Sequence, residues 1–234
     1  MNSPRQLQFF VTPPQPCPYL EAREAISLFA EPEALDNRLY SRLARLGFRR
    51  SGNQVYRPAC AGCGACVPAR IPVRAFRPHR RDRRCLAGNA DLGMRWTQAR
   101  YSEEHFRLYS RYLDARHPAG GMDSPTPEQF CQFLIGDWSD TGFLELRLDD
   151  RLVAVGVTDR LDDGLSAVYT FYDPELSGRG LGNYTVLRQV DLARQLHLPY
   201  LYLGYWVEGS RKMAYKGRFR PLEILIDGQW RTLS

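Results

Sequence analysis

The chain has 234 residues, of which 44% are hydrophobic, and this is enough for one sizeable core or for two small domains. It contains no apolar run of roughly 18 residues that would span a membrane, and its N-terminus lacks the basic and apolar regions of a secretory signal. Six cysteines in a chain of this length do not form a dense disulfide framework, so they are expected to be reduced thiols or ligands. The sequence therefore predicts a cytoplasmic protein with no membrane partner.

A strand, a helix and a hairpin are predicted before residue 60. The stretch "EAISLFA" (24–30) alternates apolar and polar residues well enough for a strand. Residues 31–47 then place leucines on one helical stripe, with Gly47 as the expected stop. The following "FRRSGNQVYRP" (48–58) predicts a hairpin that turns at Gly52 and Asn53.

Three cysteines follow at an even C-x2-C-x2-C spacing in "CAGCGAC" (60–66). Thiolates at such a spacing are ligands in iron–sulfur proteins, and zinc accepts four thiolates tetrahedrally. A fourth ligand is available if the N-terminal segment folds back over this loop. The alternative is a glycine-rich loop in which small cysteines only pack, since the paired spacing of a zinc ribbon is absent. The candidate metal ligands are Cys17, Cys60, Cys63 and Cys66.

An arginine-rich stretch, "RIPVRAFRPHRRDRRC" (70–85), comes next. Residues 1–100 carry 17 basic and 7 acidic side chains, whereas residues 101–234 carry 15 and 19. The guanidinium fork binds oxyanions bidentately, and a polyanion gains affinity by releasing counterions. A chain-wide preference for arginine over lysine explains the residue type but not this clustering. We therefore predict a nucleic-acid-binding surface that contains Arg77, Arg80, Arg81, Arg83 and Arg84.

Two helices are expected next, the first capped by Ser102 and the second by Thr126 with Pro127 at its first position. Residues 142–172 then predict three consecutive strands joined by tight acidic turns. A glycine-rich loop, "SGRGLGN" (177–183), opens a further helix. A strand, a short helical crossing and a closing hairpin complete the chain.

This order of elements resembles a GNAT-type acyltransferase, which implies an α/β (α+β) fold. In that fold the glycine-rich loop offers backbone N–H groups to a phosphate at the positive end of the helix dipole. Ser177 stands where an arginine or glutamine is typical of loops that bind coenzyme A. We expect an N-terminal basic, cysteine-containing subdomain over residues 1–100 and a GNAT-like aminoacyl-transferase domain over residues 101–234.

Four separated motifs carry a narrower resemblance that spans roughly residues 7–233: "CPYLEAREA", "GFRRSGNQVYRPACAGCGACVPARIPV", "VYTFYDPELSGRGLGNY" and "YLYLGYWVEGSRKMAYKGRFRPLE". Together they resemble the aminoacyl-tRNA–protein transferases of the arginyl-transferase type, and more closely the compact bacterial members that transfer leucine. The resemblance implies an enzyme of the N-end rule pathway that moves an aminoacyl group from charged tRNA to proteins with N-terminal Asp or Glu. "CPYL" and the single cysteine of "GACVP" depart from the larger arginyl-transferring relatives.

The chemistry of such a transfer suggests the remaining candidates. An aminoacyl ester is already activated, so no cofactor is required, although zinc or an iron–sulfur cluster at the cysteines stays possible. The acidic acceptor needs a cation, and its amine must lose a proton. The alternative for the two proton-handling candidates is that one starts a turn and the other lies in the core. The candidates are Arg70, Lys212 and Lys216 for the acceptor carboxylate, Tyr169 and Asp173 for proton handling, and Arg179 with the arginine cluster for tRNA.

Three alternative hypotheses for the function stay open at this point. The first is an arginyl-tRNA–protein transferase of the same family, because the transferred residue is set by the shape of a pocket. The second is a coenzyme A-dependent N-acetyltransferase, against which Ser177 and the basic N-terminal half both count. The third is a non-catalytic RNA-binding module that uses the arginine cluster.

Overall fold

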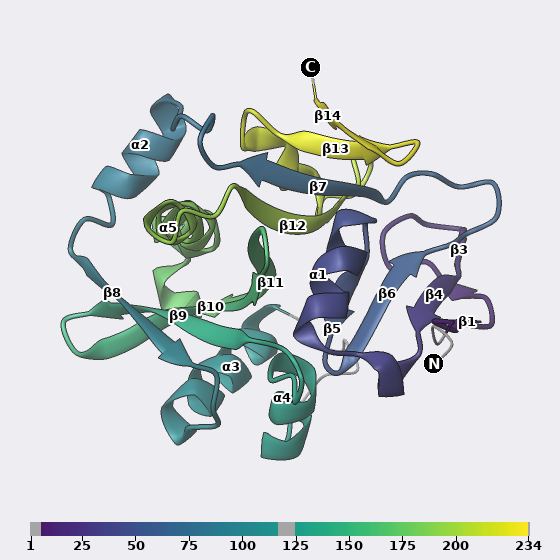
Figure 1. Cartoon of the computed structure of the whole chain (residues 1–234). Coiled ribbons are helices and arrows are strands. Elements are labelled where there is room, and N and C mark those ends of the chain that lie inside the picture. The colour runs from purple at the N-terminus through teal and green to yellow at the C-terminus, as the bar shows by residue number, and fades with distance from the viewer. Residues whose placement is uncertain (1–5, 117–124, 234) are drawn as a thin grey trace.

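The computed structural model describes residues 6–116 and 125–233, which form a mixed α/β structure around one large mixed sheet (Figure 1). This sheet has eight strands in the order β14-β13-β7-β12-β11-β10-β9-β8. Neighbouring strands are antiparallel except for β11 and β12, which are parallel. The strands are β7 (Val67–Pro72), β8 (Leu92–Gln98), β9 (Thr141–Leu148), β10 (Arg151–Leu161), β11 (Gly164–Tyr172), β12 (Tyr200–Trp206), β13 (Glu223–Ile226) and β14 (Gln229–Thr232).

A second sheet of four strands, in the order β1-β4-β6-β5, is built from the N-terminal part of the chain. Its strands are β1 (Phe9–Val11), β4 (Ser27–Ala30), β5 (Arg49–Ser51) and β6 (Gln54–Pro58), and β2 (Gln15–Pro16) pairs separately with β3 (Glu24–Ala25). Helix α1 (Asn37–Arg45) follows the 3-10 helix η1 (Pro32–Ala34). Buried residues of α1, such as Tyr40 and Leu43, form one apolar cluster with Val55 of the small sheet and Tyr202 of the large one. The two sheets therefore share a core.

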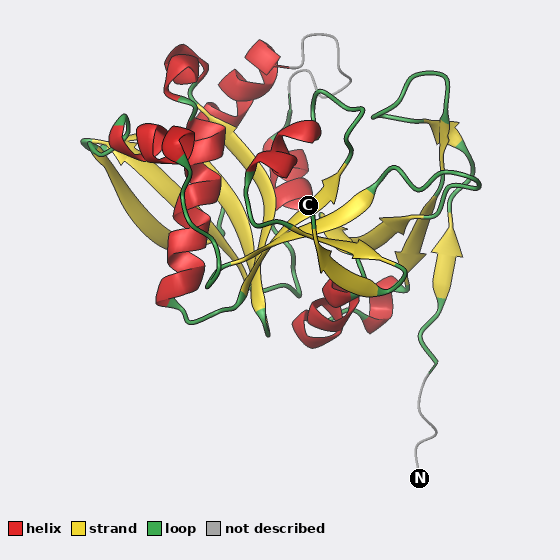
Figure 2. Ribbon diagram, turned by 90° about the horizontal axis from the view of Figure 1, so that it is seen from above, coloured by secondary structure: helices red, strands yellow, loops and turns green. Residues whose placement is uncertain are grey.

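Helices cover both faces of the large sheet (Figures 1 and 2). Apolar residues of α5 (Leu181–Gln195) pack with those of β7 and β12 on one face. On the other face, α3 (Glu103–Arg116) and α4 (Pro127–Leu134) pack with apolar residues of β9, β10 and β11. The remaining helical elements are α2 (Arg80–Ala87), η2 (Pro174–Arg179) and η3 (Ala214–Arg218).

The parallel pair β11 and β12 separates part-way along its length. The pairing of the two strands begins with Gly164 opposite Tyr200 and ends with Ser166 opposite Tyr202. Beyond these residues β11 keeps its pairing with β10, and β12 keeps its pairing with β7. We use "the wedge" for the region between residues 168–172 of β11 and 204–206 of β12.

Local sequence signals placed several elements correctly. Ser102 Oγ accepts a hydrogen bond from the backbone N–H of His105 at 3.2 Å, and Thr126 Oγ1 accepts one from Gln129 at 3.3 Å. The hairpin between β5 and β6 turns at Gly52, whose φ of 57° is in the left-handed region that suits glycine. These three predictions are confirmed.

The predicted domain boundary at residue 100 falls between strands of the same large sheet. Strands β7 and β8 precede that residue, yet both belong to the eight-stranded sheet, β7 in its interior and β8 at its edge. Residue 100 therefore does not separate the two sheets, and the two-domain division stays a prediction. None of the helices in the described residues is long and apolar enough to cross a membrane.

Candidate functional site

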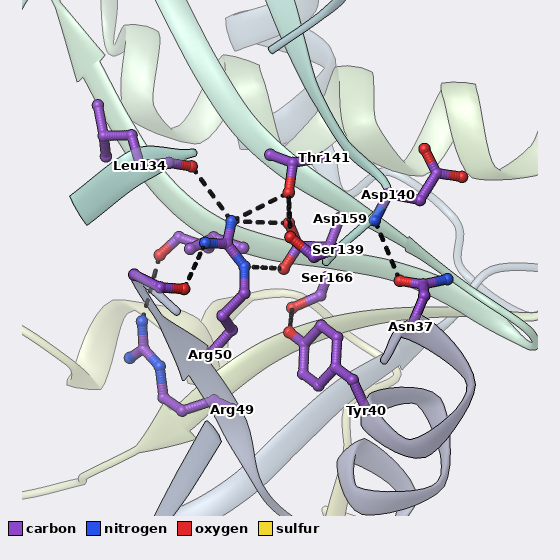
Figure 3. Close-up of polar contacts among 12 residues, drawn as sticks. Asn37, Tyr40, Arg49, Arg50, Leu134, Ser139, Asp140, Thr141, Asp159 and Ser166 are labelled. Atoms are coloured by element: carbon purple, nitrogen blue, oxygen red, sulfur yellow. Dashed lines mark hydrogen bonds and ion pairs between the residues drawn. The ribbon is translucent and has the colours of Figure 1, made fainter. Parts of the chain in front are cut away.

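A buried ion pair fixes the N-terminal sheet against the large one (Figure 3). Arg50 on β5 donates from Nε to Asp159 Oδ2 and from Nη2 to Asp159 Oδ1, both at 2.8 Å. Both side chains are fully buried, and Thr141 Oγ1 also donates to Asp159 Oδ1 at 2.7 Å. Because neighbouring side chains on a strand point to opposite faces, the same strand directs Arg49 the other way.

Arg49 reaches the wedge. Its Nη2 donates to the carbonyl oxygen of Val168 on β11 at 3.2 Å. A Cβ on Gly204 of β12 would lie 3.3 Å from Nη1 of the same guanidinium, and Gly204 has a φ of 71°. The bend at this glycine in β12 therefore leaves room for a cation from the small sheet.

Lys216, in η3, interacts electrostatically with this guanidinium from a different element. Its Nζ donates to the carbonyl oxygen of Tyr205 at 2.8 Å, and the residue is 5% exposed. Burial, followed by repulsion from Arg49, holds the pKa of Lys216 well below its ordinary value, and the nearby Cys66 acts weakly in the opposite sense. The ammonium of Lys216 is therefore easier to deprotonate than that of an exposed lysine, which suits proton exchange better than pairing with a carboxylate.

Tyrosines from three elements surround these two basic groups. The hydroxyl of Tyr205 donates to the backbone carbonyls of Gly47 and Tyr56, both at 3.0 Å. Tyr19, from the N-terminal segment, is near Tyr56 and Arg49, and burial raises its pKa to about 12. The N-terminal segment thus folds back over this region, as the cysteine hypothesis required.

The four predicted metal ligands are neighbours. Burial, followed by the charges of Cys17, Cys60 and Cys63, raises the pKa of Cys66 to about 11. The thiol of Cys60 is engaged with the backbone of Ile26, accepting from its N–H at 3.3 Å. No group of three or more His, Cys, Asp or Glu side chains converges on a common metal position within residues 6–116 and 125–233. The thiols as placed do not fit a tetrahedral ligand set, so no step is assigned to a metal, and a cluster here stays a prediction.

The glycine-rich loop is contacted by the turn after α2. Arg179 Nε donates to Asn89 Oδ1 at 3.0 Å, and Asn89 Nδ2 returns a bond to the Arg179 carbonyl at 3.0 Å. Arg179 also pairs with Asp91. Gly180 adopts a φ of 66° at the start of α5, and Cys85 of α2 is at its side. Arg179 therefore has partners within the chain, and its contact with tRNA stays a prediction.

The arginine cluster forms an exposed basic surface on α2 and the segment before it. Arg77 and Arg83 donate to nearby backbone carbonyls, and Arg81 bonds the carbonyl of Arg218. Within the described part of the chain, Arg80 and Arg84 have no partner. We call the exposed side chains of Arg77, Arg80, Arg81, Arg83 and Arg84 the α2 arginine surface.

Arg70 and Lys216 are not in one site. The Arg70 guanidinium is 3.5 Å from the Tyr200 ring centroid and 4.2 Å from that of Trp230, and its Nε donates to Glu223 Oε2 at 2.7 Å. Its charge is thus already paired. Lys212 is exposed in the turn before η3. Acceptor binding by these residues stays a prediction.

Asp173 and Tyr169 have clear structural partners. Asp173 is fully buried, accepts from the N–H of Glu175 at 3.1 Å as the N-cap of η2, and pairs with Arg111 and Arg151 at 3.0 and 3.4 Å. Tyr169 is half-buried among the rings of α3 and α4, and burial raises its pKa. Proton transfer by either residue stays a prediction.

A hollow of about 540 Å³ is found between the β5–β6 turn and helices α3 and α4. Tyr109 and Phe133 line it, and both also contact the ring of Tyr169 on the wall of the wedge. Amide side chains of Asn53 and Gln54 form the opposite side. The hollow is therefore next to the ring of Tyr169, a residue of β11.

Comparison with known proteins identifies the family. The family model "Arginine-tRNA-protein transferase, N terminus" matches residues 15–84, and "Arginine-tRNA-protein transferase, C terminus" matches residues 104–226. The chain belongs to the arginine-tRNA-protein transferase family.

Members of this family with the curated name "Aspartate/glutamate leucyltransferase" match the full length of the chain. The one from Marinobacter nauticus is 50% identical over 100% of this chain and 99% of its own. The one from Nitrosococcus oceani is 49% identical over 100% and 99%, and that from Alcanivorax borkumensis is 51% identical over 97% and 95%. The resemblance inferred from the four sequence motifs is confirmed.

Solved structures with a similar fold are distant in sequence. "The structure of L-PGS from Bacillus licheniformis" matches with a TM-score of 0.51 at 11% identity, over 72% of this chain and 58% of that one. The C-terminal domain of a putative lysylphosphatidylglycerol synthetase from Agrobacterium fabrum also gives 0.51, at 14% identity, over 80% and 64%. Because the sequence identities are only 11% and 14%, these similarities concern the fold and not the activity.

Sequence reasoning missed Arg49, Tyr56 and Tyr205 as parts of this family member's candidate site. Arg49 is one of thirty arginines, and nothing in its local sequence marks it. One signal was available, because Gly204 interrupts the apolar strand "YLYLGYW", and a glycine inside a strand often marks a close approach.

Proposed function

We propose that the protein transfers leucine from charged tRNA to the α-amine of proteins that begin with Asp or Glu, marking them for the N-end rule pathway. The observation that carries this proposal is the match over essentially the whole chain to relatives named aspartate/glutamate leucyltransferase. Its substrates are then aminoacyl-tRNA and proteins with acidic N-termini, and charged tRNA places the reaction in the cytoplasm.

The reaction exchanges an ester for an amide. The acceptor amine attacks the ester carbonyl carbon of the aminoacyl group, so a C–N bond forms and the C–O bond to the ribose breaks. The acceptor ammonium loses two protons: the first passes to a base and then to solvent and leaves a nucleophilic amine, and the second leaves the nitrogen after attack and ends on the ribose oxygen of the released tRNA. The enzyme must bring the two substrates together and hold the proton that moves between them.

Two basic groups in the wedge suit this chemistry. Lys216, in the neutral form that its burial favours, can take the proton from the acceptor ammonium. Arg49 is a guanidinium, which stays charged, and it interacts electrostatically with Lys216, so it can stabilise the negative charge that develops on the carbonyl oxygen. Lys212, which is exposed in the turn before η3, then remains the proposed cation for the acceptor carboxylate.

We also propose that the fold is of the GNAT type, with the cysteine-containing N-terminal part as an addition to it. A parallel strand pair that separates, with the first strand leading through a glycine-rich loop into a helix, supports this assignment. The phosphate-facing side of that loop differs from a coenzyme A site, because α2 and Arg179 are joined there by Asn89 and Asp91. This counts against the acetyltransferase alternative.

One experiment tests the function. The protein is incubated with tRNA charged with leucine, arginine or phenylalanine, together with peptides that begin with Asp, Glu, Ala or Lys, and products are weighed by mass spectrometry. We expect leucine to be added to the Asp and Glu peptides. Addition of arginine in its place would favour the arginyl alternative. RNA binding without any transfer would support a non-catalytic module.

A further inference from the structure

One face of the small sheet carries a continuous row of rings. In the strand register, Phe10 of β1 is opposite Phe29 of β4, Phe29 is opposite Tyr56 of β6, and Tyr56 is opposite Arg49 of β5. Directly opposite residues of antiparallel strands project from the same face. We call Phe10, Phe29 and Tyr56 the ring row, and it ends at the Arg49 guanidinium.

The ring row connects the protein surface with the wedge. Phe10 is 51% exposed, whereas Phe29 and Tyr56 are half-buried. The rings of Phe29 and Tyr56 are stacked, with centroids 5.4 Å apart and planes at 27°. Tyr56 in turn lies 6.3 Å from the Tyr205 ring and 6.0 Å from the Arg49 guanidinium carbon. A molecule bound along the row would therefore be led towards Lys216, which bonds the carbonyl of Tyr205.

The opposite face of the same sheet packs against the core. Phe9, the neighbour of Phe10, contacts the ring of Phe48 at 5.6 Å. Ala30 and Val55 on the face of Phe9 are buried with α1 in the shared core. The core thus uses one face of the sheet, and the ring row is on the other.

We propose that the ring row is a stacking platform for the unpaired 3′ end of the charged tRNA, which it guides into the wedge. The inference rests on the proposed function, which requires that the esterified 3′ nucleotide reach Arg49 and Lys216. Single-stranded nucleotides bind through bases that stack on aromatic side chains, and a cationic group completes such sites. The row provides rings in sequence from the outside, with the cation at the inner end.

An acidic peptide fits the row less well. The carboxylate of its first residue needs a cation, but the one cation at the inner end of the row, Arg49, is the group that the proposed function assigns to the developing oxyanion. Base stacking also tolerates any sequence, because every base has a π-face. We therefore expect the acceptor peptide to approach the wedge from another side.

Adjacent residues on β1 supply a matched pair of variants. Phe10→Ala removes the outer ring of the row, and Phe9→Ala removes an equal ring, 40% exposed, from the other face. The probe is an RNA hairpin with a short unpaired 3′ end whose last base is 2-aminopurine, because stacking quenches its fluorescence. No aminoacyl group is needed, so the measurement does not depend on transfer.

We expect Phe10→Ala to weaken binding of this hairpin by about 5- to 100-fold, the effect of one stacked base, and Phe10→Trp to preserve it. Phe9→Ala should stay within about twofold of the wild type, and a blunt-ended hairpin should bind all four proteins alike. Equal binding of the tailed hairpin by Phe10→Ala and the wild type would overturn the platform. A rise in the peptide KM of Phe10→Ala with unchanged hairpin binding would also overturn it, and would assign the row to the acceptor.

The two proposals fail separately. Quenching that depends on Phe10, in a protein that transfers no amino acid, would sustain the platform and reject the transferase. Normal leucyl transfer by Phe10→Ala at an unchanged KM for charged tRNA would sustain the transferase and reject the platform.

Discussion

Arg50 and Asp159 meet through two hydrogen bonds of 2.8 Å, and neither side chain has any exposed surface. They come from β5 of the small sheet and β10 of the large one, so the pair is a direct link between the two sheets. Breaking a buried pair by removing one partner leaves the other charge without compensation. The position of Arg49 in the wedge depends on this link, because the two arginines are adjacent.

We predict that Arg50→Met and Asp159→Asn each lower the free energy of unfolding by about 3 to 5 kcal/mol. Arg50→Met with Asp159→Leu together should recover part of this loss, because no buried charge remains. Chemical denaturation measures the three values. Two single variants that each stay within about 0.5 kcal/mol of the wild type would contradict the assignment of the pair as a structural link.

The α2 arginine surface should dominate the salt dependence of tRNA binding. Arg80→Ala with Arg84→Ala removes two exposed cations that have no partner within the described residues, and Arg38→Ala with Arg42→Ala removes two exposed cations from α1. We expect the first pair to reduce the slope of log K against log salt by about 1 to 2, and the second pair to leave it unchanged. Equal slopes for both pairs would reject this surface as the tRNA footprint.

Lys216 should give the reaction a characteristic pH dependence. A neutral amine accepts the proton, so kcat should rise as pH increases through the lowered pKa of Lys216 and then level off. Lys216→Arg keeps a positive charge that does not titrate, and it should lower kcat by about 10²- to 10⁴-fold with little change in tRNA affinity. A rate profile that is the same in wild type and variant would exclude proton transfer by this amine.

The lowered pKa of Lys216 should also make the free energy of unfolding depend on pH. Between the lowered pKa of folded Lys216 and its ordinary value of about 10.5, the unfolded chain binds a proton that the folded chain does not. The contribution of Lys216 to the free energy of unfolding should therefore rise with pH across that window. Arg49 and Cys66 are the groups that interact with it, and both are retained in Lys216→Met. Melting temperatures of the two proteins should converge as pH increases, and a constant difference would contradict the lowered pKa.

Asp173→Asn separates a structural from a catalytic carboxylate. Asparagine is as good an N-cap as aspartate, so η2 should keep its start, while the pairs with Arg111 and Arg151 are lost. We expect a loss of about 1 to 3 kcal/mol in stability and a kcat within about threefold of the wild type. A folded variant whose kcat falls by about 10²-fold or more would instead assign proton transfer to Asp173.

The features predicted correctly from the sequence are those set by interactions between residues close together in the chain. Ser102, Thr126 and Gly52 act within a few residues of themselves, and the structure has each in its expected role. The place of β7 was not predictable in this way, because its neighbours β12 and β13 lie far away in the chain. The strand of residues 92–98 was missed, although Leu92, Met94 and Trp96 alternate with Gly93, Arg95 and Thr97 as a strand pattern requires.

The candidate site shows the same contrast between residues that local sequence marks and residues that only the fold brings together. The arginines of α2 were recognised because they are clustered in sequence, and the structure leaves them exposed. Lys216 was selected as a cation, but its burial beside Arg49 could not be read from "RKMAYKG". Arg49 was overlooked because its partners, Val168 and Tyr56, are supplied by other strands.

The interior position of β7, between β12 and β13, also bears on how the chain folds during synthesis. The ribosome releases β7 more than a hundred residues before either neighbour, so this apolar strand must wait with both edges unpaired. Loop closure over that span is slow, and the large sheet is completed only when the last part of the chain has emerged. A nascent chain stalled before β12 would therefore expose β7, and it should be a better substrate for chaperones than one stalled after β13.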